Sequence, residues 1–482
     1  MSHLDIREIL NQSFQNNAKK TAIDYNKTVI TYEELEKKVD DYAKEFRENF
    51  PTRSKVLLVM KDPIEFIAVW IGLLRFDCVI VPFQGKENVE EIERAMTASN
   101  CDVLIDDRNI EEISCTAVVK STVNTSIVYR IMEQQPITER YRESSVFFYT
   151  SGTTGLPKCV AFSRQAITEN VMCLVDELCL TNQDVFFTPL SPTLTATITT
   201  AVLPALAVGA DLVLTNSSLP GGILKKIQDK KVSIFFAVPY VYDLLNGSMK
   251  DDRVSVWNSV RICLTSSAFM KTDTFDTFLE KTGLPMRSIY CSSEGGAITF
   301  NKSNDSNVTK SSVGASFSGV EIKILDENKK ELECGTVGEI YVGGSHLAIG
   351  YYNMPELEET VFLDGCVKTG DLGYLDENGY LFLKGRSSDT INVSGYLVNP
   401  EEVEQILIRY EKIKDAVVFG KEEEGSGQVV AAKIILQDGE TEWNEDDLYA
   451  YCNQYLETYK IPRQVQVVSE ITSGRYGKKI RK

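Results

Sequence analysis

The segment FYTSGTTGLPK, residues 148–158, is the most informative stretch of this 482-residue chain. It follows an apolar run, residues 146–149, that predicts a strand, and it then gathers hydroxyls and glycines in a loop closed by Lys158. Glycine lets a backbone approach a ligand closely, and free N–H groups, hydroxyls and an ammonium suit a polyphosphate. The spacing differs from GxxxxGK[ST], because Cys159 follows the lysine. Taken alone, the segment leaves a Thr/Gly turn between two strands as an equal alternative.

Length and composition are those of a large globular protein. At roughly 100–200 residues per domain, the chain predicts two or three domains. Hydrophobic residues make up 43% and charged residues 25%, an ordinary globular balance. The formal net charge of −18 disfavours binding to nucleic acid, which needs a basic surface for the phosphates.

The histidine and cysteine counts limit the metal sites, catalytic relays and disulfides that the chain can form. The two histidines, His3 and His346, nearly exclude a histidine zinc site or a Ser-His-Asp relay. The 11 cysteines form no CxxC pair, and without a signal peptide they indicate buried thiols in a reducing cytosol, so we expect a cytoplasmic protein. Residues 185–210 are uncharged and long enough to cross a bilayer, yet they contain three prolines. A buried helix beside a pocket is therefore favoured over a membrane span.

The order of strand and helix patterns predicts the architecture. The two patterns alternate over residues 55–105 and again over residues 210–264, which indicates parallel sheets with helices on their faces. Strands and turns dominate from about Gly314. We predict an α/β fold whose N-terminal domain, residues 1–386, holds stacked α/β subdomains and a β-rich subdomain. Residues 387–482 should form a small mobile α+β domain of ordinary size.

Six segments resemble, in order, the signatures of the adenylate-forming (AMP-binding) superfamily. Its members include acyl-CoA synthetases, aryl-CoA ligases, peptide-synthetase adenylation domains and beetle luciferases. Residues 150–158 resemble its TSGTTGxPK signature. The other matches are residues 290–294 (YGxTE), 350–353 (RGYxN), 368–372 (TGDL), 385–396 (the GRxDDxIxxxGxxV hinge) and 477–481 (GKxxR). The motifs run from Thr150 to Arg481, and the first 149 residues resemble the family only in their general pattern of strands and helices.

The resemblance implies an ATP site with Mg²⁺. Glu294 would hold the metal against phosphate oxygens, although a surface turn is the simpler alternative for it. Tyr290 would stack on adenine, Asp371 would accept both ribose hydroxyls, and Arg386 would hold ribose or phosphate. A solvated turn is the alternative for Asp371. The nucleotide-binding residues implied are Thr150, Ser151, Gly152, Thr153, Thr154, Gly155, Lys158, Ser266, Ser267, Ala268, Tyr290, Cys291, Ser292, Ser293, Asp371, Arg386 and Lys478. The catalytic residues implied are Lys478, Glu294 and Thr154.

The basic C-terminal tail carries the lysine that the resemblance makes catalytic. Five of the last eight residues are basic, which could simply be a solvated end. By resemblance, Lys478 steadies the carboxylate and the α-phosphate. The small domain would then be a lid that brings a catalytic group to the site.

The sequence departs from the family pattern at several positions, among them Tyr396-Leu397 in the hinge and residues 191–194, where many acid ligases carry a histidine. Two further departures bear most on function. The hinge residue that is usually acidic or lysine is Ser388 here. Amino-acid-activating members place an aspartate where our alignment, counted backwards from Gly209, gives Ala196. An uncompensated buried ammonium costs several kcal/mol, so an α-amino acid substrate is disfavoured.

The resulting expectation is an ATP-dependent carboxylic acid ligase. It would form an acyl-adenylate and pyrophosphate, and then transfer the acyl group to a thiol, CoA or phosphopantetheine. Loading of a separate acyl carrier protein and amino-acid adenylation remain alternatives. A nucleotide-binding protein without turnover is the alternative from another class, and Ser388 is its only support. The sequence does not select the acid.

Overall fold

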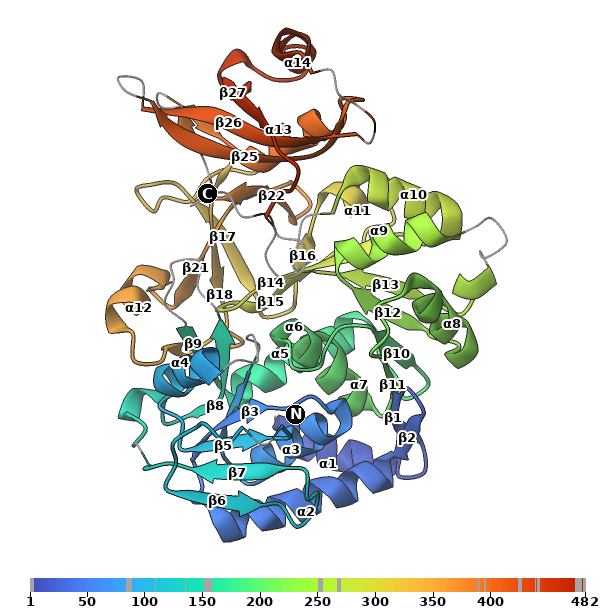
Figure 1. Cartoon of the computed structure of the whole chain (residues 1–482), viewed down its shortest axis with the longest axis vertical. Coiled ribbons are helices and arrows are strands. Elements are labelled where there is room, and N and C mark those ends of the chain that lie inside the picture. The colour runs from blue at the N-terminus through green and yellow to red at the C-terminus, as the bar shows by residue number, and fades with distance from the viewer. Residues whose placement is uncertain are drawn as a thin grey trace.

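The structure is a computed structural model. It describes residues 4–83, 89–108, 110–134, 136–150, 158–249, 255–266, 270–387, 389, 391–393, 396–423, 427–437, 439, 443–472 and 479. The chain forms a large N-terminal domain and a C-terminal domain that has a sheet of its own (Figure 1). Two large sheets with their helices make up the first domain, as the alternating patterns predict.

The first large sheet contains eight described strands. They are β3 (Lys55–Val59), β4 (Val79–Pro82), β5 (Val103–Asp106), β6 (Ala117–Lys120), β7 (Val128–Ile131), β8 (Ser144–Thr150), β9 (Lys158–Ser163) and β19 (Gly350–Tyr351). Their order is β19-β9-β8-β4-β3-β5-β7-β6. Strand β3 is parallel to both β4 and β5, and helices α3 (Pro63–Arg75) and α4 (Val89–Ser99) supply the crossovers that parallel pairing requires.

The second large sheet contains fourteen strands within the described ranges. They are β1 (Thr21–Tyr25), β2 (Thr28–Thr31), β10 (Val185–Thr188), β11 (Asp211–Leu214), β12 (Ile234–Ala237), β13 (Ile262–Thr265), β14 (Met286–Ser292), β15 (Gly296–Phe300), β16 (Gly314–Ser316), β17 (Glu321–Leu325), β18 (Gly338–Gly343), β20 (Phe362–Leu363), β21 (Cys366–Leu375) and β22 (Tyr380–Arg386). Strand β14 is parallel to β13 and antiparallel to β15. The expected β-rich subdomain is therefore continuous with an α/β sheet.

Alternating side chains show that both sheets are covered on two faces. In β3, Val56 and Leu58 belong to the largest core cluster, whereas Leu57 and Val59 belong to a second cluster on the opposite face. In β10, Phe186 joins the largest cluster and Phe187 a third one. A period of two with apolar residues on both sides is typical of a buried parallel sheet.

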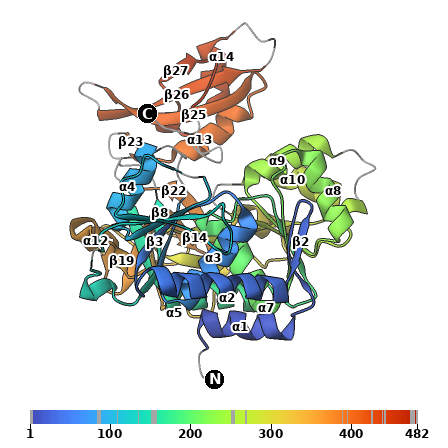
Figure 2. The same ribbon diagram turned by 60° about the horizontal axis from the view of Figure 1, so that its bottom comes forward.

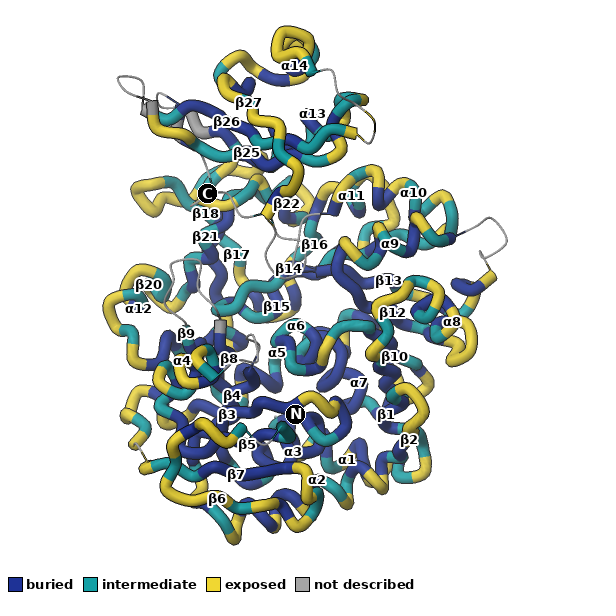
Figure 3. The backbone as a smooth tube through the Cα atoms, viewed as in Figure 1, coloured by how far each residue is buried: buried dark blue, intermediate teal, exposed yellow. Residues whose placement is uncertain are grey.

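Helices fill the layer between the two sheets and cover the outer face of the second. The central layer includes α1 (Ile6–Asn16), α2 (Tyr32–Asn49), α3, α5 (Arg164–Glu177), the π-helical segment η2 (Ile198–Val202) and α7 (Leu203–Val208). The outer helices are α8 (Pro220–Lys230), α9 (Pro239–Ser248) and α10 (Thr272–Thr282). Residues of β3, β4, β5 and α3 are almost all buried (Figure 3), whereas α1 and α2, which Figure 2 shows along the edge of the domain, alternate buried with exposed residues.

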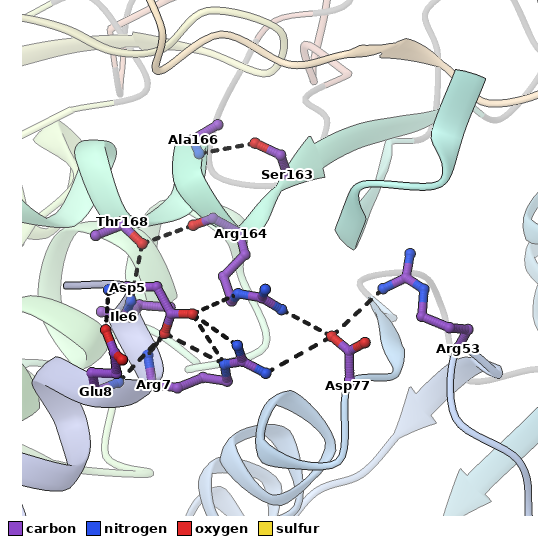
Figure 4. A network of polar contacts seen from close by, with 10 residues as sticks. All are labelled: Asp5, Ile6, Arg7, Glu8, Arg53, Asp77, Ser163, Arg164, Ala166 and Thr168. Atoms are coloured by element: carbon purple, nitrogen blue, oxygen red, sulfur yellow. Dashed lines mark hydrogen bonds and ion pairs between the residues drawn. The ribbon is translucent and has the colours of Figure 1, made fainter. Parts of the chain in front are cut away.

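A network of ion pairs anchors α1 and α5 to the first sheet (Figure 4). Arg164, at the start of α5, bonds to Asp5 at 2.8 Å and to Asp77 at 2.8 Å. Arg7 also pairs with Asp5, and Arg53 lies 3.8 Å from Asp77. The two aspartates thus join residues from four separate stretches of chain. The network fixes the N-terminus of α5, the helix that supports the candidate site.

The C-terminal domain packs around its own core. Asn399 caps α13 (Pro400–Ile408), with a proline at the first position, as the sequence predicts. This helix packs on a sheet of β25 (Ile413–Glu423), β26 (Gly427–Leu436) and β27 (Gln464–Val467), beside α14 (Glu445–Cys452). A two-stranded sheet of β23 (Ile391–Val393) and β24 (Tyr396–Val398) precedes it.

The remaining short helices of the large domain are η1 (Glu139–Tyr141), α6 (Thr195–Thr197), α11 (Ser306–Ser311) and α12 (Pro355–Val361), and η4 (Thr458–Lys460) lies in the small domain. None of the helices in the described part of the chain combines the length and the apolar character needed to cross a membrane. The uncharged stretch 185–210 instead forms β10 and the helical run α6-η2-α7.

Candidate functional site

The two described residues that flank the glycine-rich segment belong to a β-hairpin. Thr150 is the last residue of β8 and Lys158 is the first of β9, and the two are paired across the antiparallel ladder. The ends of the segment that the sequence marks as a phosphate loop are therefore neighbours in one ladder. Five of its predicted residues, Ser151, Gly152, Thr153, Thr154 and Gly155, lie outside the described residues.

Tyr351 connects a cation and an anion at the base of this hairpin. The ammonium of Lys158 lies 5.1 Å from the centroid of the Tyr351 ring. The Tyr351 hydroxyl donates a hydrogen bond to Oε1 of Glu294 at 2.5 Å. Burial and the neighbouring carboxylate raise the pKa of this hydroxyl, which keeps it protonated as a donor. The predicted phosphate ligand and the predicted metal ligand thus share one neighbour.

The turn that carries Glu294 is fixed by buried polar contacts. The Ser292 hydroxyl accepts a hydrogen bond from Gly295 N–H at 2.7 Å. Gly296 has φ 62°, and an added Cβ would lie 2.1 Å from Oδ1 of Asn170, so a side chain does not fit there. Asn170, on α5, accepts from Ala297 N–H at 2.7 Å. The anchored helix α5 therefore sets the position of the turn that the sequence predicts to bind the metal.

Asp371, Tyr290 and Arg386 form a second polar centre on neighbouring strands. The Tyr290 hydroxyl donates to Oδ2 of Asp371 at 2.5 Å, and Nε of Arg386 lies 3.0 Å from Oδ1. Asp371 and Arg386 face each other in the β21–β22 ladder. Burial, followed by the Asp371 charge, raises the pKa of the Tyr290 hydroxyl. The three residues that the sequence assigns to adenine and ribose are therefore in direct contact.

Arg386 links the two centres electrostatically. Burial lowers the pKa of its guanidinium, but the Asp371 carboxylate, followed by Tyr290, Asp389 and Glu294, outweighs that effect, and the net pKa is raised. A positive charge therefore lies beside Asp371 and within electrostatic range of Glu294. Such a charge suits a phosphate that lies between them.

The other predicted nucleotide contacts are partly described. Ser266 is buried at the end of β13 and hydrogen-bonds to the Cys291 thiol. Burial raises the pKa of Cys291 to about 12, so the thiol is not a nucleophile at neutral pH. Ser293 is half-buried beside Glu294. Ser267 and Ala268 lie outside the described residues.

The predicted acyl region has no charge of its own. Ala196 is half-buried against the main core, and the run α6-η2-α7 contains the π-helical turn. Such turns occur often at functional sites. The hydroxyl of Thr197 is buried and has no hydrogen-bond partner among the described residues. The flanking acid Asp184 bonds to Arg261 at 2.9 Å and so does not reach into this region as a free carboxylate.

Lys478 and Ser388 lie outside the described residues, so the roles expected of them remain predictions. The neighbouring Lys479 is described, and its ammonium donates to the Asp415 carboxylate at 2.7 Å. Sequence reasoning included Tyr351 in a motif but gave it no role, and it missed Glu358, which hydrogen-bonds to Tyr351. The only local sign of this contact was the glycine before Tyr351, because a glycine lets a side chain such as that of Glu358 approach the backbone closely.

Comparisons with known proteins agree with this geometry. Residues 10–352 match the family model for AMP-binding enzymes, and residues 402–478 match that for the AMP-binding enzyme C-terminal domain. The putative acyl-CoA ligase YdaB of Bacillus subtilis (strain 168) is 25% identical over 468 residues, which cover 93% of this chain and 92% of YdaB. The probable CoA ligase CCL9 of Humulus lupulus is 25% identical over 461 residues, which cover 88% of this chain and 84% of CCL9.

Solved structures show the same fold. ATP-bound MatB from Rhodopseudomonas palustris superposes with a TM-score of 0.85 at 22% identity, covering 99% of this chain and 97% of that one. The apo form of the same protein gives a TM-score of 0.77 over the same shares.

Proposed function

Because the chain belongs to the AMP-binding enzyme family, we propose that it couples ATP to the activation of a small carboxylic acid and then transfers the acyl group to the thiol of CoA. The observation that carries this proposal is the pair of polar centres joined by Arg386. One centre, Asp371 with Tyr290, suits a nucleoside. The other, Lys158 with Glu294, suits phosphates and a cation.

Adenylation needs only binding and charge stabilisation from the protein. The acid's carboxylate oxygen attacks the α-phosphorus, a C–O–P link forms, and the bond from the α-phosphorus to pyrophosphate breaks. Residues 150–158 would hold the phosphates, Asp371 would accept the ribose hydroxyls, and Arg386 and Lys478 would stabilise the developing charge. These roles are positioning and electrostatic stabilisation, which together account for large rate enhancements.

The residues at Glu294 fit Mg²⁺. The described residues contain no cluster of three or more acids, histidines or cysteines that could hold a metal by themselves. Mg²⁺ bound with a nucleotide usually takes one or two carboxylates and completes its shell with phosphates and water. A single carboxylate next to a phosphate loop therefore suffices, and the bound cation would neutralise phosphate charge. Glu294 would hold it, with Lys158 beside it on the phosphates.

Thiol transfer would follow after the small domain moves. The thiol loses its proton to solvent, the sulfur attacks the acyl carbon to form the C–S bond, and AMP leaves with the electron pair of the broken C–O bond. Rotation of the small domain would remove Lys478 from the site and admit the thiol, as expected of a lid that carries a catalytic group. CoA is favoured as acceptor because curated relatives are CoA ligases.

A pyrophosphate-release screen over carboxylic acids tests the proposal. Each acid is assayed with ATP and Mg²⁺, first alone and then with CoA or with a phosphopantetheinylated carrier protein. We expect acid-dependent pyrophosphate release, and acyl-CoA formation with CoA. If the acyl thioester formed only with the carrier protein, the acceptor would be a carrier protein and not CoA. If no acid caused pyrophosphate release, the function would be nucleotide binding without turnover.

A further inference from the structure

Helix α12 carries three glutamates, of which one is buried. Glu356 and Glu359 are exposed, whereas Glu358 is only 6% exposed. A carboxylate is retained in such a place only when charges and hydrogen bonds compensate for lost hydration. Glu358 forms an ion pair with Arg140 and accepts a hydrogen bond from the Tyr141 hydroxyl at 2.5 Å.

Glu358 and Tyr141 together hold the backbone of Tyr351. Oε2 of Glu358 accepts the Tyr351 N–H at 3.2 Å, and the Tyr141 hydroxyl lies 2.8 Å from the Tyr351 carbonyl oxygen. The preceding residue, Gly350, makes this approach possible, because a Cβ there would lie 2.3 Å from Oε2 of Glu358. The Tyr351 N–H is therefore held by a side chain from outside its own strand, and the Tyr351 carbonyl oxygen lies beside the Tyr141 hydroxyl and accepts the Met354 N–H at 3.1 Å.

The side chain of Tyr351 keeps two opposite charges apart. Lys158 lies over the ring, and Glu294 accepts from the hydroxyl at the far end of the same ring. Within the described residues no ion pair joins Lys158 to Glu294. A direct pair between them would engage both the group available to phosphate and the group available to a cation, and it would have to break when the nucleotide binds.

We propose that Glu358 is a positioning residue of the nucleotide site. It fixes the backbone of Tyr351, and the tyrosine in turn holds Glu294 and Lys158 separate and oriented for ATP with Mg²⁺. This inference rests on the proposed function. It adds a residue that contacts neither ATP nor the cation and acts through Tyr351 alone.

The test measures ATP binding by calorimetry at a series of Mg²⁺ concentrations, without any acid substrate. The variants are Glu358→Gln, Tyr351→Phe and the double variant, with Glu356→Gln as the matched control from the exposed face of α12. We expect each of the two single variants to raise the Mg²⁺ concentration for half-maximal ATP binding at least threefold. The control should match the unaltered protein.

The double variant separates positioning from general stability. If Glu358 acts through the Tyr351 hydroxyl, adding Glu358→Gln to Tyr351→Phe should raise the Mg²⁺ concentration for half-maximal ATP binding by less than a further twofold. The inference would be overturned if Glu358→Gln raised the half-maximal Mg²⁺ concentration by the same factor with and without the Tyr351 hydroxyl. It would also be overturned if Glu358→Gln lowered only the melting temperature and left the Mg²⁺ dependence of ATP binding unchanged. If Glu358→Gln does not fold, Tyr141→Phe replaces it, because it removes the donor to the same carboxylate, and the same shift is expected. Absence of ATP binding by the unaltered chain would instead overturn the proposed function, and this inference with it.

Discussion

The hydroxyl of Tyr290 donates a 2.5 Å hydrogen bond to the Asp371 carboxylate, and Arg386 approaches the other oxygen of the same group. The aspartate is thereby fixed from two sides before any ligand binds. Each carboxylate oxygen can accept more than one hydrogen bond, so the ribose hydroxyls can still be accepted. A side chain held in this way loses little conformational freedom on binding.

Replacement of Asp371 by alanine should weaken ATP binding at least tenfold. Two ribose hydroxyls would lose an ionised acceptor worth roughly 1.5–3 kcal/mol per bond. Calorimetry with ATP measures the change. Asp376→Ala is the control, because this acid caps the turn between β21 and β22 and accepts the Tyr380 N–H at 2.8 Å. Equal affinities for the two variants would show that Asp371 has only a structural role.

Lys478→Ala should lower adenylate formation by about 10²–10³-fold, the usual effect of removing a group that stabilises transition-state charge. Transfer from chemically supplied acyl-adenylate to the thiol should fall by less than about tenfold, because the lysine is not needed in that step. Lys479→Ala is the matched control, since that ammonium is bound to Asp415. The two half-reactions are followed separately, and an equal loss in both contradicts a mobile lid.

Acid should destabilise the large domain through His346. Burial lowers the pKa of His346 to about 4, although Glu169 opposes the shift. The unfolded chain therefore binds the proton first, and stability that is complete above about pH 6.5 is lost as the pH falls towards 4. A shift of this size corresponds to a stability difference on the order of 3 kcal/mol.

The His346 effect can be measured in two ways. The melting temperature should fall less between pH 7 and pH 5 for His346→Gln than for the unaltered chain. The chain has two histidines, so a His3→Gln variant leaves His346 as the one imidazole ring, whose Cε1 proton signal can be followed by NMR. That signal should not move between pH 8 and pH 5.5. Titration near pH 6.5 would refute the prediction.

Cys291→Ala should retain pyrophosphate release within about threefold of the unaltered protein. Its pKa of about 12 leaves almost no thiolate at neutral pH, so a covalent intermediate on this residue is not expected. Cys179 and Cys334 are exposed and should be the first thiols alkylated in the native protein. Complete loss of activity in Cys291→Ala would point to covalent catalysis instead.

Local sequence signals predicted much of the fold. The alternation of strand and helix patterns over residues 55–105 is confirmed by β3, α3, β4, α4 and β5, and Asn399 followed by Pro400 begins α13. These features depend on neighbouring residues, such as a capping side chain followed by proline. The continuity of the second sheet was not predictable, because it depends on β14 pairing with β13 on one side and β15 on the other.

The site was predictable as a set of motifs but not as a set of contacts. Asp371 and Arg386 were expected to serve the same nucleotide, and the ladder between β21 and β22 places them face to face. The contact of Tyr141 with Glu358 joins residues 217 positions apart and has no local signature. Only the fold brings such residues together, which explains why sequence reasoning overlooked Glu358.

The last prediction concerns the class of acid. Residues 185–210 contain no charged side chain, and Ala196 lies on this stretch, half-buried against the core. Two other acids, Asp243 and Glu169, lie on other segments, where Asp243 accepts a hydrogen bond from Thr274 and Glu169 accepts one from Ser345. An α-ammonium bound against residues 185–210 would therefore find no carboxylate on that stretch, and desolvation would oppose its binding.

A carboxylic acid with an apolar or aromatic body loses nothing in such a region and gains roughly 25 cal/mol per Å² of apolar area buried. We therefore expect pyrophosphate release with some non-amino acid to be at least about tenfold more efficient than with any proteinogenic amino acid, a difference of about 1.4 kcal/mol in transition-state stabilisation. The comparison is made in kcat/KM across one panel. Ala196→Asp, which restores an acid at this position, should narrow the gap. If a proteinogenic amino acid leads the panel for the unaltered chain, its ammonium must be bound by an acid from another segment.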